Sequence, residues 1–348
     1  MPDKITLQEI ARLAKLSPAT VSRVLNKTAT VSQEAERRVR SALAKLGASQ
    51  QRSNRTHVLC FLLANRPMLH PFHAHVLMGA QAFAAEKGSH ILFYPFQYAA
   101  SAPPDDIMLP VLFERPGLVD GYIVGGMNAP NLLNYLQRAG LPFSVLGNNV
   151  LGDWRPEELD VVWIDDVNGG YELTRYLIGL GHRAIWFLGS RRFPERRIFE
   201  GYRRAMQESG LEPQSVQSDS DDEREAGYIE FKALLSRGVR PTAVFAHSDA
   251  VAHGAMDAAL SVGLKVPEDL SIAGFGNRPE AAALSPSLTT AWGYPEQAGR
   301  RLAELALNRI ATPDAPPVTV TVPTKLVKRE SCAKAFEQAV AGLREKSM

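Results

Sequence analysis

The sequence predicts an N-terminal all-α helix-turn-helix headpiece followed by an α/β body with two doubly wound lobes. Two observations lead to this prediction. The first fifty residues contain three short amphipathic helical patterns, and from residue 58 onward short apolar runs alternate with amphipathic stretches. We expect a helix-turn-helix domain over residues 1–48, a short linker over 49–57, a two-lobed body over 58–335 and a C-terminal tail over 336–348.

The composition is that of a soluble globular protein. The chain has 348 residues, of which 45% are hydrophobic and 22% are charged. No apolar run approaches the ~20 residues needed to cross a bilayer, and the first residues lack the features of a secretory signal. We therefore expect a cytoplasmic protein with no membrane partner, in which Cys60 and Cys332 remain thiols.

Charge is unevenly distributed along the chain. Residues 1–57 hold eleven Lys and Arg against four Asp and Glu, a net charge of +7, although the whole chain carries only +2. The remainder is therefore mildly acidic. A compact basic module suits a polyanion such as nucleic acid, although an excess of this size is also typical of a solvated surface.

The first helix is predicted to follow Thr6. Thr6 and Glu9 have the spacing of a capping box, and apolar residues then recur at helical spacing. The stripe predicted to face inward consists of Leu7, Ile10, Leu13 and Ala14.

Two more short helices are predicted after the first. Ser17 is placed as an N-cap with Pro18 in the first helical position, and a third helix starts at Ser32 and ends at Gly47. The inward faces are predicted to be Val21, Val24 and Leu25 in the second helix, and Ala35, Val39, Ala42, Leu43 and Leu46 in the third. Three short helices with the first two closely joined indicate a helix-turn-helix.

The other face of the second helix carries small or hydrogen-bonding residues that can approach a DNA groove. Arg23 has the fork geometry that recognises guanine. A solvated helix face is the alternative interpretation of the same pattern. The face consists of Ala19, Thr20, Ser22, Arg23 and Asn26.

The body shows the rhythm of parallel sheets covered by helices. Strands are predicted over residues 58–63, 91–94, 121–124, 143–146, 184–188, 243–245 and 270–274, and helices over 75–87, 129–139, 170–180, 199–208, 227–235 and 251–262. The pattern repeats, so we expect two lobes with a cleft between them. Ligands of such sheets bind beyond the carboxyl ends of the strands.

The runs TLQEIA at 6–11 and ATVSRVLN at 19–26 closely resemble the headpiece of the LacI family of regulators. The body carries further phrases of that family, which are DD at 165–166, GG at 169–170, LGHR at 180–183, GY at 201–202, VPEDLS at 266–271, GFG at 274–276, SPSLTT at 285–290 and RES at 329–331. The resemblance implies the type I periplasmic-binding-protein fold, a homodimer, and a small-molecule effector in the interlobe cleft that controls affinity for a double-stranded DNA operator.

The resemblance also implies roles in DNA binding. By position, Pro18, Ala19 and Arg23 would contact bases, with Arg23 contributing discrimination on the order of 1–3 kcal/mol. Leu7 belongs to the same candidate surface. The residues that would position the DNA backbone are Thr6, Ser17, Thr20, Ser22, Asn26 and Ser32.

Two features of the N-terminal region depart from the family. Lys15 occupies a turn position where the family usually has glycine, and lysine can enter a left-handed conformation at a cost of roughly 1 kcal/mol. Residues 48–57 lack the leucine that the family inserts into the minor groove. The linker is therefore either a flexible tether or an atypical hinge helix.

Several positions that the family uses to bind its effector are changed here. Ser248 replaces an asparagine, Asp249 is kept, and Gly276 replaces an aspartate that often holds a sugar hydroxyl, which weakens the prediction of an ordinary hexose. Phe72 and His73 stand where the family often has two aromatics, suited either to stacking on a ring or to closing the lobe.

Four arginines follow the strand at 184–188, namely Arg191, Arg192, Arg196 and Arg197. Arg196 and Arg197 are the nearest by spacing to the GY phrase, and guanidinium groups suit a carboxylate or a phosphate. We hypothesise an acidic effector such as a uronate or a sugar phosphate. A solvated loop is the alternative.

Other classes of protein fit less well. The imidazoles of His70, His73 and His75 lack a fourth ligand nearby, so we expect no metal and no cofactor. No nucleophile elbow or phosphate loop indicates an enzyme. A solute-binding protein of the same fold would explain the body but not the basic N-terminal module.

Overall fold

The computed structural model describes residues 6–26, 32, 35, 38–39, 42, 55–66, 70–103, 107, 117–190, 196–218 and 222–335, and these are the residues discussed below. The chain divides into two compact units. The first combines residues 1–58 with 109–120, and the second combines 59–108 with 121–348.

The described part of the headpiece begins with two short helices joined by a tight turn. Helix α1 (Leu7–Ala14) starts with the predicted capping box between Thr6 and Glu9, and ends at Lys15, whose backbone is left-handed at φ 53° and ψ 48°. Helix α2 (Pro18–Asn26) follows. The hydroxyl of Ser17 accepts a hydrogen bond from the Thr20 N–H at 3.1 Å, so the predicted N-cap is confirmed.

The core of the headpiece differs in part from the predicted stripe. Ile10, Ala11 and Ala14 are buried together with Val21, Val39 and Ala42, whereas Leu7 and Leu13 are 44% and 39% exposed. At ~100° per residue, Leu13 lies about 60° outside the arc that Ile10, Ala11 and Ala14 define, and Leu7 lies at the helix end. Helical residues are described at positions 35, 38, 39 and 42, whereas the predicted Leu43, Leu46 and Gly47 lie outside the described residues.

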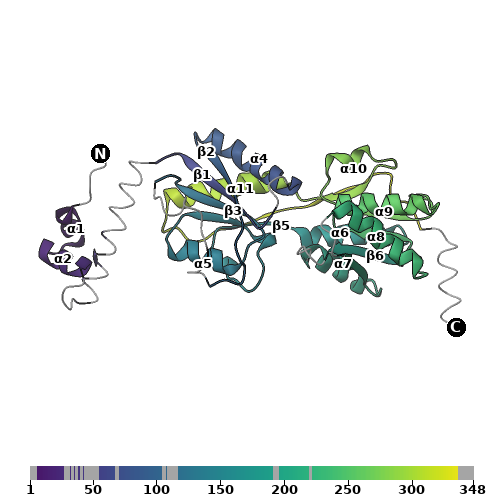
Figure 1. Ribbon diagram of the computed structural model, residues 1–348, viewed down its shortest axis with the longest axis horizontal. Coiled ribbons are helices and arrows are strands. Elements are labelled where there is room, and N and C mark those ends of the chain that lie inside the picture. Colours follow the sequence, from purple (N-terminus) through teal and green to yellow (C-terminus); the bar gives the residue numbers. More distant parts are fainter. Residues whose placement is uncertain are drawn as a thin grey trace. The chain divides into compact units, whose positions relative to one another are not determined.

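The N-terminal lobe is built on a six-stranded sheet of order β11-β5-β4-β3-β1-β2. Its strands are β1 (Val58–Ala64), β2 (His90–Phe96), β3 (Gly121–Gly126), β4 (Phe143–Leu146), β5 (Val161–Ile164) and β11 (Thr319–Val322). Helices α4 (Pro71–Glu86) and α11 (Pro295–Ala311) cover one face and α5 (Pro130–Arg138) covers the other (Figure 1). Short 3-10 turns lie at Gly147–Asn149 and Pro156–Glu158.

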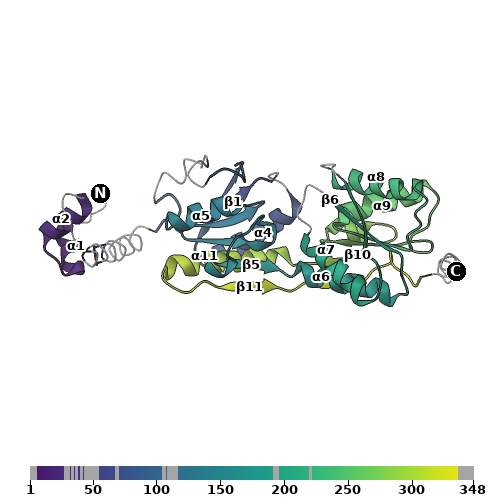
Figure 2. The same cartoon turned by 90° about the horizontal axis from the view of Figure 1, so that it is seen from below.

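The C-terminal lobe repeats this plan with the order β12-β10-β9-β8-β6-β7. Its strands are β6 (Ile185–Ser190), β7 (Gln214–Ser218), β8 (Ala243–Ala246), β9 (Ser271–Phe275), β10 (Thr289–Trp292) and β12 (Lys325–Val327), the last antiparallel to β10. The pair α6 (Asp166–Gly179) and α7 (Arg196–Glu208) lies on one face, opposite the pair α8 (Glu223–Ser236) and α9 (Asp249–Ser261) (Figure 2). Helix α10 (Pro279–Ala283) follows β9.

Three segments of chain cross between the two sheets. They connect β5 to α6, β10 to α11 and β11 to β12. Two of the crossings are bonded to each other, because the Asp165 N–H donates to the Val322 oxygen at 2.9 Å and the Thr324 hydroxyl donates to the Asp165 oxygen at 3.3 Å. The carboxyl ends of the parallel strands therefore meet at these crossings, which is where such folds bind ligands.

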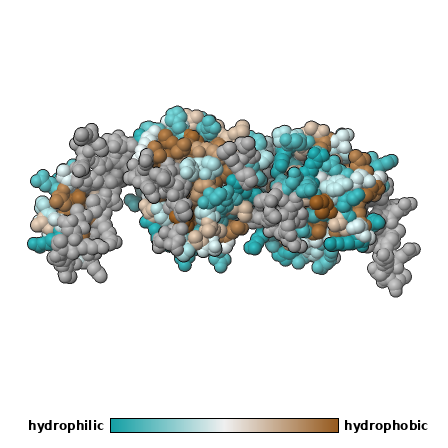
Figure 3. All heavy atoms as spheres, in the orientation of Figure 1, coloured by the Kyte–Doolittle hydropathy of each residue, from teal (hydrophilic) through white to brown (hydrophobic). Residues whose placement is uncertain are grey.

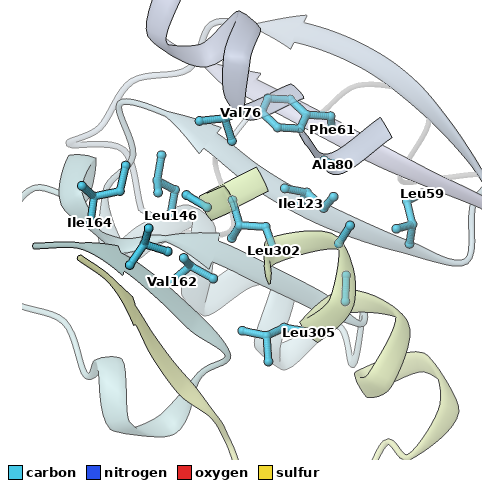
Figure 4. Close-up of a cluster of buried hydrophobic side chains, with 14 of the residues drawn as sticks. Leu59, Phe61, Val76, Ala80, Ile123, Leu146, Val162, Ile164, Leu302 and Leu305 are labelled. Carbon is cyan, nitrogen blue, oxygen red and sulfur yellow. The ribbon is translucent and has the colours of Figure 1, made fainter. Parts of the chain in front are cut away.

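Each sheet is buried by apolar side chains. In the N-terminal lobe the cluster includes Leu59, Phe61, Ile123, Val162 and Leu302, so it joins β1, β3 and β5 to α11 (Figure 4). Strand β1 is buried from Leu59 to Ala64, as expected for a central parallel strand covered on both faces.

Glycines allow the covering helices to pack closely in pairs. A Cβ on Gly79 of α4 would overlap the carbonyl oxygen of Glu296, and one on Gly299 of α11 would overlap that of Val76. The same reciprocal arrangement joins α6 to α7 through Gly170 and Gly201, and α8 to α9 through Gly227 and Gly254.

The predicted fold class is confirmed, but several elements were missed. Strands β5, β7, β10, β11 and β12 have three to five residues each, too few to show a clear period. Helix α11 was also missed, although it has 17 residues. Helix α4 begins four residues earlier than predicted, because Pro71 occupies its first turn.

The surface shows hydrophobic residues interspersed with hydrophilic ones on the face seen in Figure 3. Among the described residues, no helix is both long enough and apolar enough to span a membrane.

The left-handed turn at Lys15 predicts a stabilising substitution. Lys15→Gly should stabilise the headpiece by about 1 kcal/mol, because glycine adopts this conformation without the clash of a Cβ. Hydrogen exchange of the α1 and α2 amides in the full-length protein should then slow about fivefold. Lys15→Ala retains the Cβ and serves as the control. Equal slowing in both variants would show that the side chain, and not the backbone, sets the stability.

Candidate nucleic-acid interface and ligand cavity

The start of α2 presents small and hydroxyl-bearing side chains to solvent. Ser17, Pro18 and Ala19 are exposed, and the Ser17 and Thr20 hydroxyl oxygens lie 2.8 Å apart. Helix N-termini and hydroxyls are common ligands of phosphate. This end of α2 therefore has the size and the chemistry needed to approach a DNA backbone.

The other predicted DNA-binding residues are placed as follows. Arg23 is exposed on α2, one turn beyond Ala19, and Ser22 is half-buried. Thr6 and Leu7 are exposed at the start of α1, and the Ser32 hydroxyl accepts from the Ala35 N–H at 3.3 Å. Asn26 ends α2, and its side chain lies outside the described residues.

A cavity of about 540 Å³ lies between the two lobes of the body. Of the seven predicted effector residues, Phe72, His73, Arg197, Ser248 and Gly276 line it. The sequence interpretation missed other residues of its wall, among them Arg66, Asn148, Asp166, Glu223, His247 and Arg278. His247 closely follows strand β8 and Asp166 closely follows strand β5. Their position just after a strand end could therefore have identified them as residues of the cavity wall.

The two neighbouring arginines of α7 have different environments. Arg197 lines the cavity, and its guanidinium carbon lies 4.5 Å from the centre of the Trp163 ring, a cation–π contact. Its Nε atom is buried without a hydrogen-bond partner among the described residues. Arg196 is exposed and does not line the cavity, so its placement argues against the predicted contact with an effector. Arg191 and Arg192 lie outside the described residues.

Asp249 does not line the cavity, because it is buried behind the wall. Its carboxylate accepts from the Thr290 hydroxyl at 2.5 Å and from the Arg278 N–H at 2.6 Å. This arrangement holds the loop at Gly276, which has a φ of 126° that favours glycine. The geometry therefore favours a positioning role for Asp249 over the predicted direct contact.

Several other charged groups in the wall are paired within the protein. Arg278 forms an ion pair with Glu223 at 2.8 Å, and the Ser248 hydroxyl also donates to Glu223 at 3.1 Å. The Arg329 guanidinium donates to the Asn277 side-chain oxygen at 2.6 Å. Asp166 accepts from the Asn148 amide at 2.6 Å, and burial raises the pKa of Asp166 to about 6.

Four of the eight histidines of the chain line this one cavity. Burial and the Arg66 charge lower the pKa of His70 to about 4, and burial lowers the pKa of His247 to about 4. Burial likewise holds the pKa of His73 well below its usual value. His75 bonds to Glu296 at 3.0 Å instead. No group of three or more metal-ligating side chains gathers in the part of the chain that the structure describes.

Comparisons with known proteins cover both parts of the molecule. Residues 6–48 match the family described as bacterial regulatory proteins, lacI family, and residues 174–332 match a periplasmic binding protein-like domain. The transcriptional repressor PurR of Edwardsiella ictaluri is 31% identical over 94% of this chain and 97% of its own length. The chain belongs to the LacI family.

Other relatives agree with this assignment. The transcriptional regulator CelR of Thermobifida fusca is 30% identical over 94% of this chain and 98% of its own length. The CelR–cellobiose complex superimposes with a TM-score of 0.67 at 26% identity, over 94% of this chain and all of that one. The lac repressor dimer bound to operator and the anti-inducer ONPF shares the fold, with a TM-score of 0.70 at 20% identity, over 95% of this chain and all of that one.

This LacI-family chain is a DNA-binding transcriptional regulator controlled by an effector, as its headpiece and its two-lobed body predicted.

The buried histidines of this LacI-family regulator predict a loss of stability in acid. The unfolded chain protonates His247 near pH 6.5, whereas the folded pKa is about 4, so protons bind the unfolded state first as the pH falls. Between about pH 7.5 and about pH 4.5, His247→Gln should lose about 2 kcal/mol less folding free energy than the unsubstituted protein. Urea unfolding at the two pH values measures this difference.

The Asp166 carboxyl acts in the opposite direction, because its raised folded pKa adds stability as the pH falls below about 6. That contribution is common to both proteins and cancels in their comparison. Identical pH dependence of the two proteins would contradict the burial of a neutral His247.

Proposed function

We propose that the protein is a homodimeric repressor that binds a two-fold symmetric operator through α2 and responds to an acidic small molecule in the interlobe cavity. The observation that carries this proposal is the presence, in one chain, of an exposed helix-turn-helix surface and of a large cavity lined from two lobes. Such a protein acts where the DNA is, so we place it in the cytoplasm, without catalysis or a cofactor.

In the headpiece we assign different tasks to different residues. Arg23 reads bases, because it is the long donor-bearing side chain exposed on α2, and Pro18 and Ala19 make apolar base contacts. Contacts to the DNA backbone come from hydroxyl and amide side chains, and Leu7 lies beside them at the start of α1. These backbone residues are Thr6, Ser17, Thr20, Ser22, Asn26 and Ser32.

The effector is proposed to be a sugar derivative that bears a carboxylate or a phosphate. Support for a sugar comes from relatives, since the similar structures include a cellobiose complex and an Enterococcus faecium family member with bound ribose. Support for the acidic group comes from Arg197, whose Nε has no hydrogen-bond partner among the described residues and whose guanidinium carbon lies 4.5 Å from the centre of the Trp163 ring. Phe72 and His73 supply aromatic faces nearby, and Ser248 and Gly276 complete the opposite wall.

A homodimer is supported by the surface of the C-terminal lobe. Tyr228 and Ile229 on α8 and Leu260 on α9 are exposed apolar residues, at 37%, 51% and 76%. Paired helix faces of this kind suit a symmetric interface. A solute-binding protein of the same fold is not favoured, because the full-length relatives are transcriptional regulators.

Base reading by Arg23 predicts a selective loss of affinity. Arg23→Ala should weaken binding to the preferred operator by about 1–3 kcal/mol and leave binding to a scrambled duplex nearly unchanged. Ser22→Ala should weaken binding to both duplexes by similar factors. Fluorescence anisotropy with both duplexes at several salt concentrations separates the two effects. Equal weakening of both duplexes by Arg23→Ala would refute its role in base reading.

The two neighbouring arginines provide a matched test of the effector. In a thermal-shift screen, glucuronate, galacturonate or glucose 6-phosphate should stabilise the protein more than glucose or galactose. Arg197→Gln should reduce affinity for the acidic ligand about tenfold or more, whereas Arg196→Gln should change it less than about twofold. Equal responses to neutral and acidic sugars, unaffected by either substitution, would rule out the acidic effector.

A further inference from the structure

The end of the linker is held by a single carboxylate. Asp120 Oδ1 accepts from the Thr56 N–H at 2.9 Å and from the Thr56 hydroxyl at 3.0 Å, and Oδ2 accepts from the His57 N–H at 2.9 Å. The Asp120 N–H in turn donates to the Val58 oxygen at 2.8 Å. These four hydrogen bonds, which we name the Asp120 clasp, join chain segments more than sixty residues apart.

The clasp holds the backbone in a conformation that is unfavourable by itself. His57 has a φ of 56°, a left-handed conformation that is unfavourable for a residue with a side chain. Such conformations persist where surrounding contacts impose them. Here the left-handed backbone of His57 accompanies the hydrogen bond from its N–H to the Asp120 carboxylate. This hydrogen bond therefore helps to offset the backbone strain.

The clasp lies at the start of two neighbouring interior strands. His57 precedes β1 and Asp120 precedes β3, and these strands are paired in parallel from Leu59 with Gly121 to Ala64 with Gly126. At the far end of β1, the Asn65 side chain accepts from the Tyr98 N–H at 2.9 Å and donates to the Met127 oxygen at 3.3 Å. Arg66, which follows, lines the cavity. One buried strand of seven residues therefore leads from the clasp to the cavity wall.

We propose that Asp120 is a positioning residue for DNA binding. Its hydrogen bonds hold the end of the linker at the start of β1 and β3, so that a displacement of these strands displaces the attachment point of the headpiece. The inference rests on the proposed function. Of the two alternatives for the linker, the inference favours one whose end is anchored over a tether that is flexible up to the first strand. The reason is that residues 56 and 57, at the end of the linker, are hydrogen-bonded to Asp120.

Freeing the clasp lengthens the segment between the headpiece and the first strand. Six residues, 49–54, lie between the end of the family match at residue 48 and Arg55. Without the clasp this segment grows by three residues. Because the effective concentration of a tethered module falls roughly as the −3/2 power of tether length, simultaneous binding by two headpieces should weaken about twofold from length alone.

The test uses the full-length protein with Asp120→Asn, which keeps the shape but loses the charge, and Thr56→Val, which removes one hydroxyl. Asp153→Asn, an exposed aspartate of the body, is the control. Hydrogen exchange should accelerate on the order of tenfold for the Thr56 and His57 amides in Asp120→Asn, less in Thr56→Val and not in the control. The exchange rates of the β1 amides of residues 59–63 should be unchanged in Thr56→Val. This variant therefore still tests the clasp if Asp120→Asn disturbs the folding of the lobe.

The second measurement is affinity for a random-sequence duplex of about 40 base pairs at low salt. Asp120→Asn should bind it about two- to fivefold more weakly than the control. Unchanged exchange, or faster exchange with unchanged affinity, would overturn the positioning role and leave the proposed function intact. Failure of the unsubstituted protein to bind the duplex would overturn the proposed function and this inference together.

Discussion

The parallel pairing of β1 with β3 organises the N-terminal lobe. Both strands lie in the interior of the sheet, and their side chains pack against α4 and α11 in the main cluster of that lobe. One end of the pair meets the linker at Asp120, and the other leads to the residues of the cavity wall. Close-packed interiors transmit displacement because they have little free volume. The same pairing therefore fixes the fold and connects the two sites.

The cavity combines groups that burial keeps neutral with groups that are paired inside the protein. His70, His73 and His247 have lowered pKa values, and Glu223 is neutralised by Arg278. Arg197 differs because it lies against an aromatic ring with a buried Nε that has no partner among the described residues. A bound anion would accept charge-assisted hydrogen bonds from this guanidinium, which are stronger than those that the hydroxyl of a neutral sugar accepts.

The sequence was sufficient to predict the structure where interactions between neighbouring residues determine it. Capping chemistry located α1 and α2, and Lys15 adopts the left-handed conformation that its turn position allows. The sequence was insufficient to predict side-chain positions that depend on tertiary packing. Arg196 and Arg197 are equivalent by composition, and only the rotation of α7 brings one of them to the cavity. The clasp was beyond reach because Asp120 and Thr56 are sixty-four residues apart and carry no motif.

A regulator that joins a sequence-reading headpiece to a ligand-controlled body in a symmetric dimer should select a symmetric DNA site. In-vitro selection from a random pool of double-stranded DNA by the full-length protein measures this. We expect enrichment of a two-fold symmetric site whose half-sites are related as the two headpieces of a dimer. Recovery of no preferred sequence, or of a single asymmetric half-site, would contradict it.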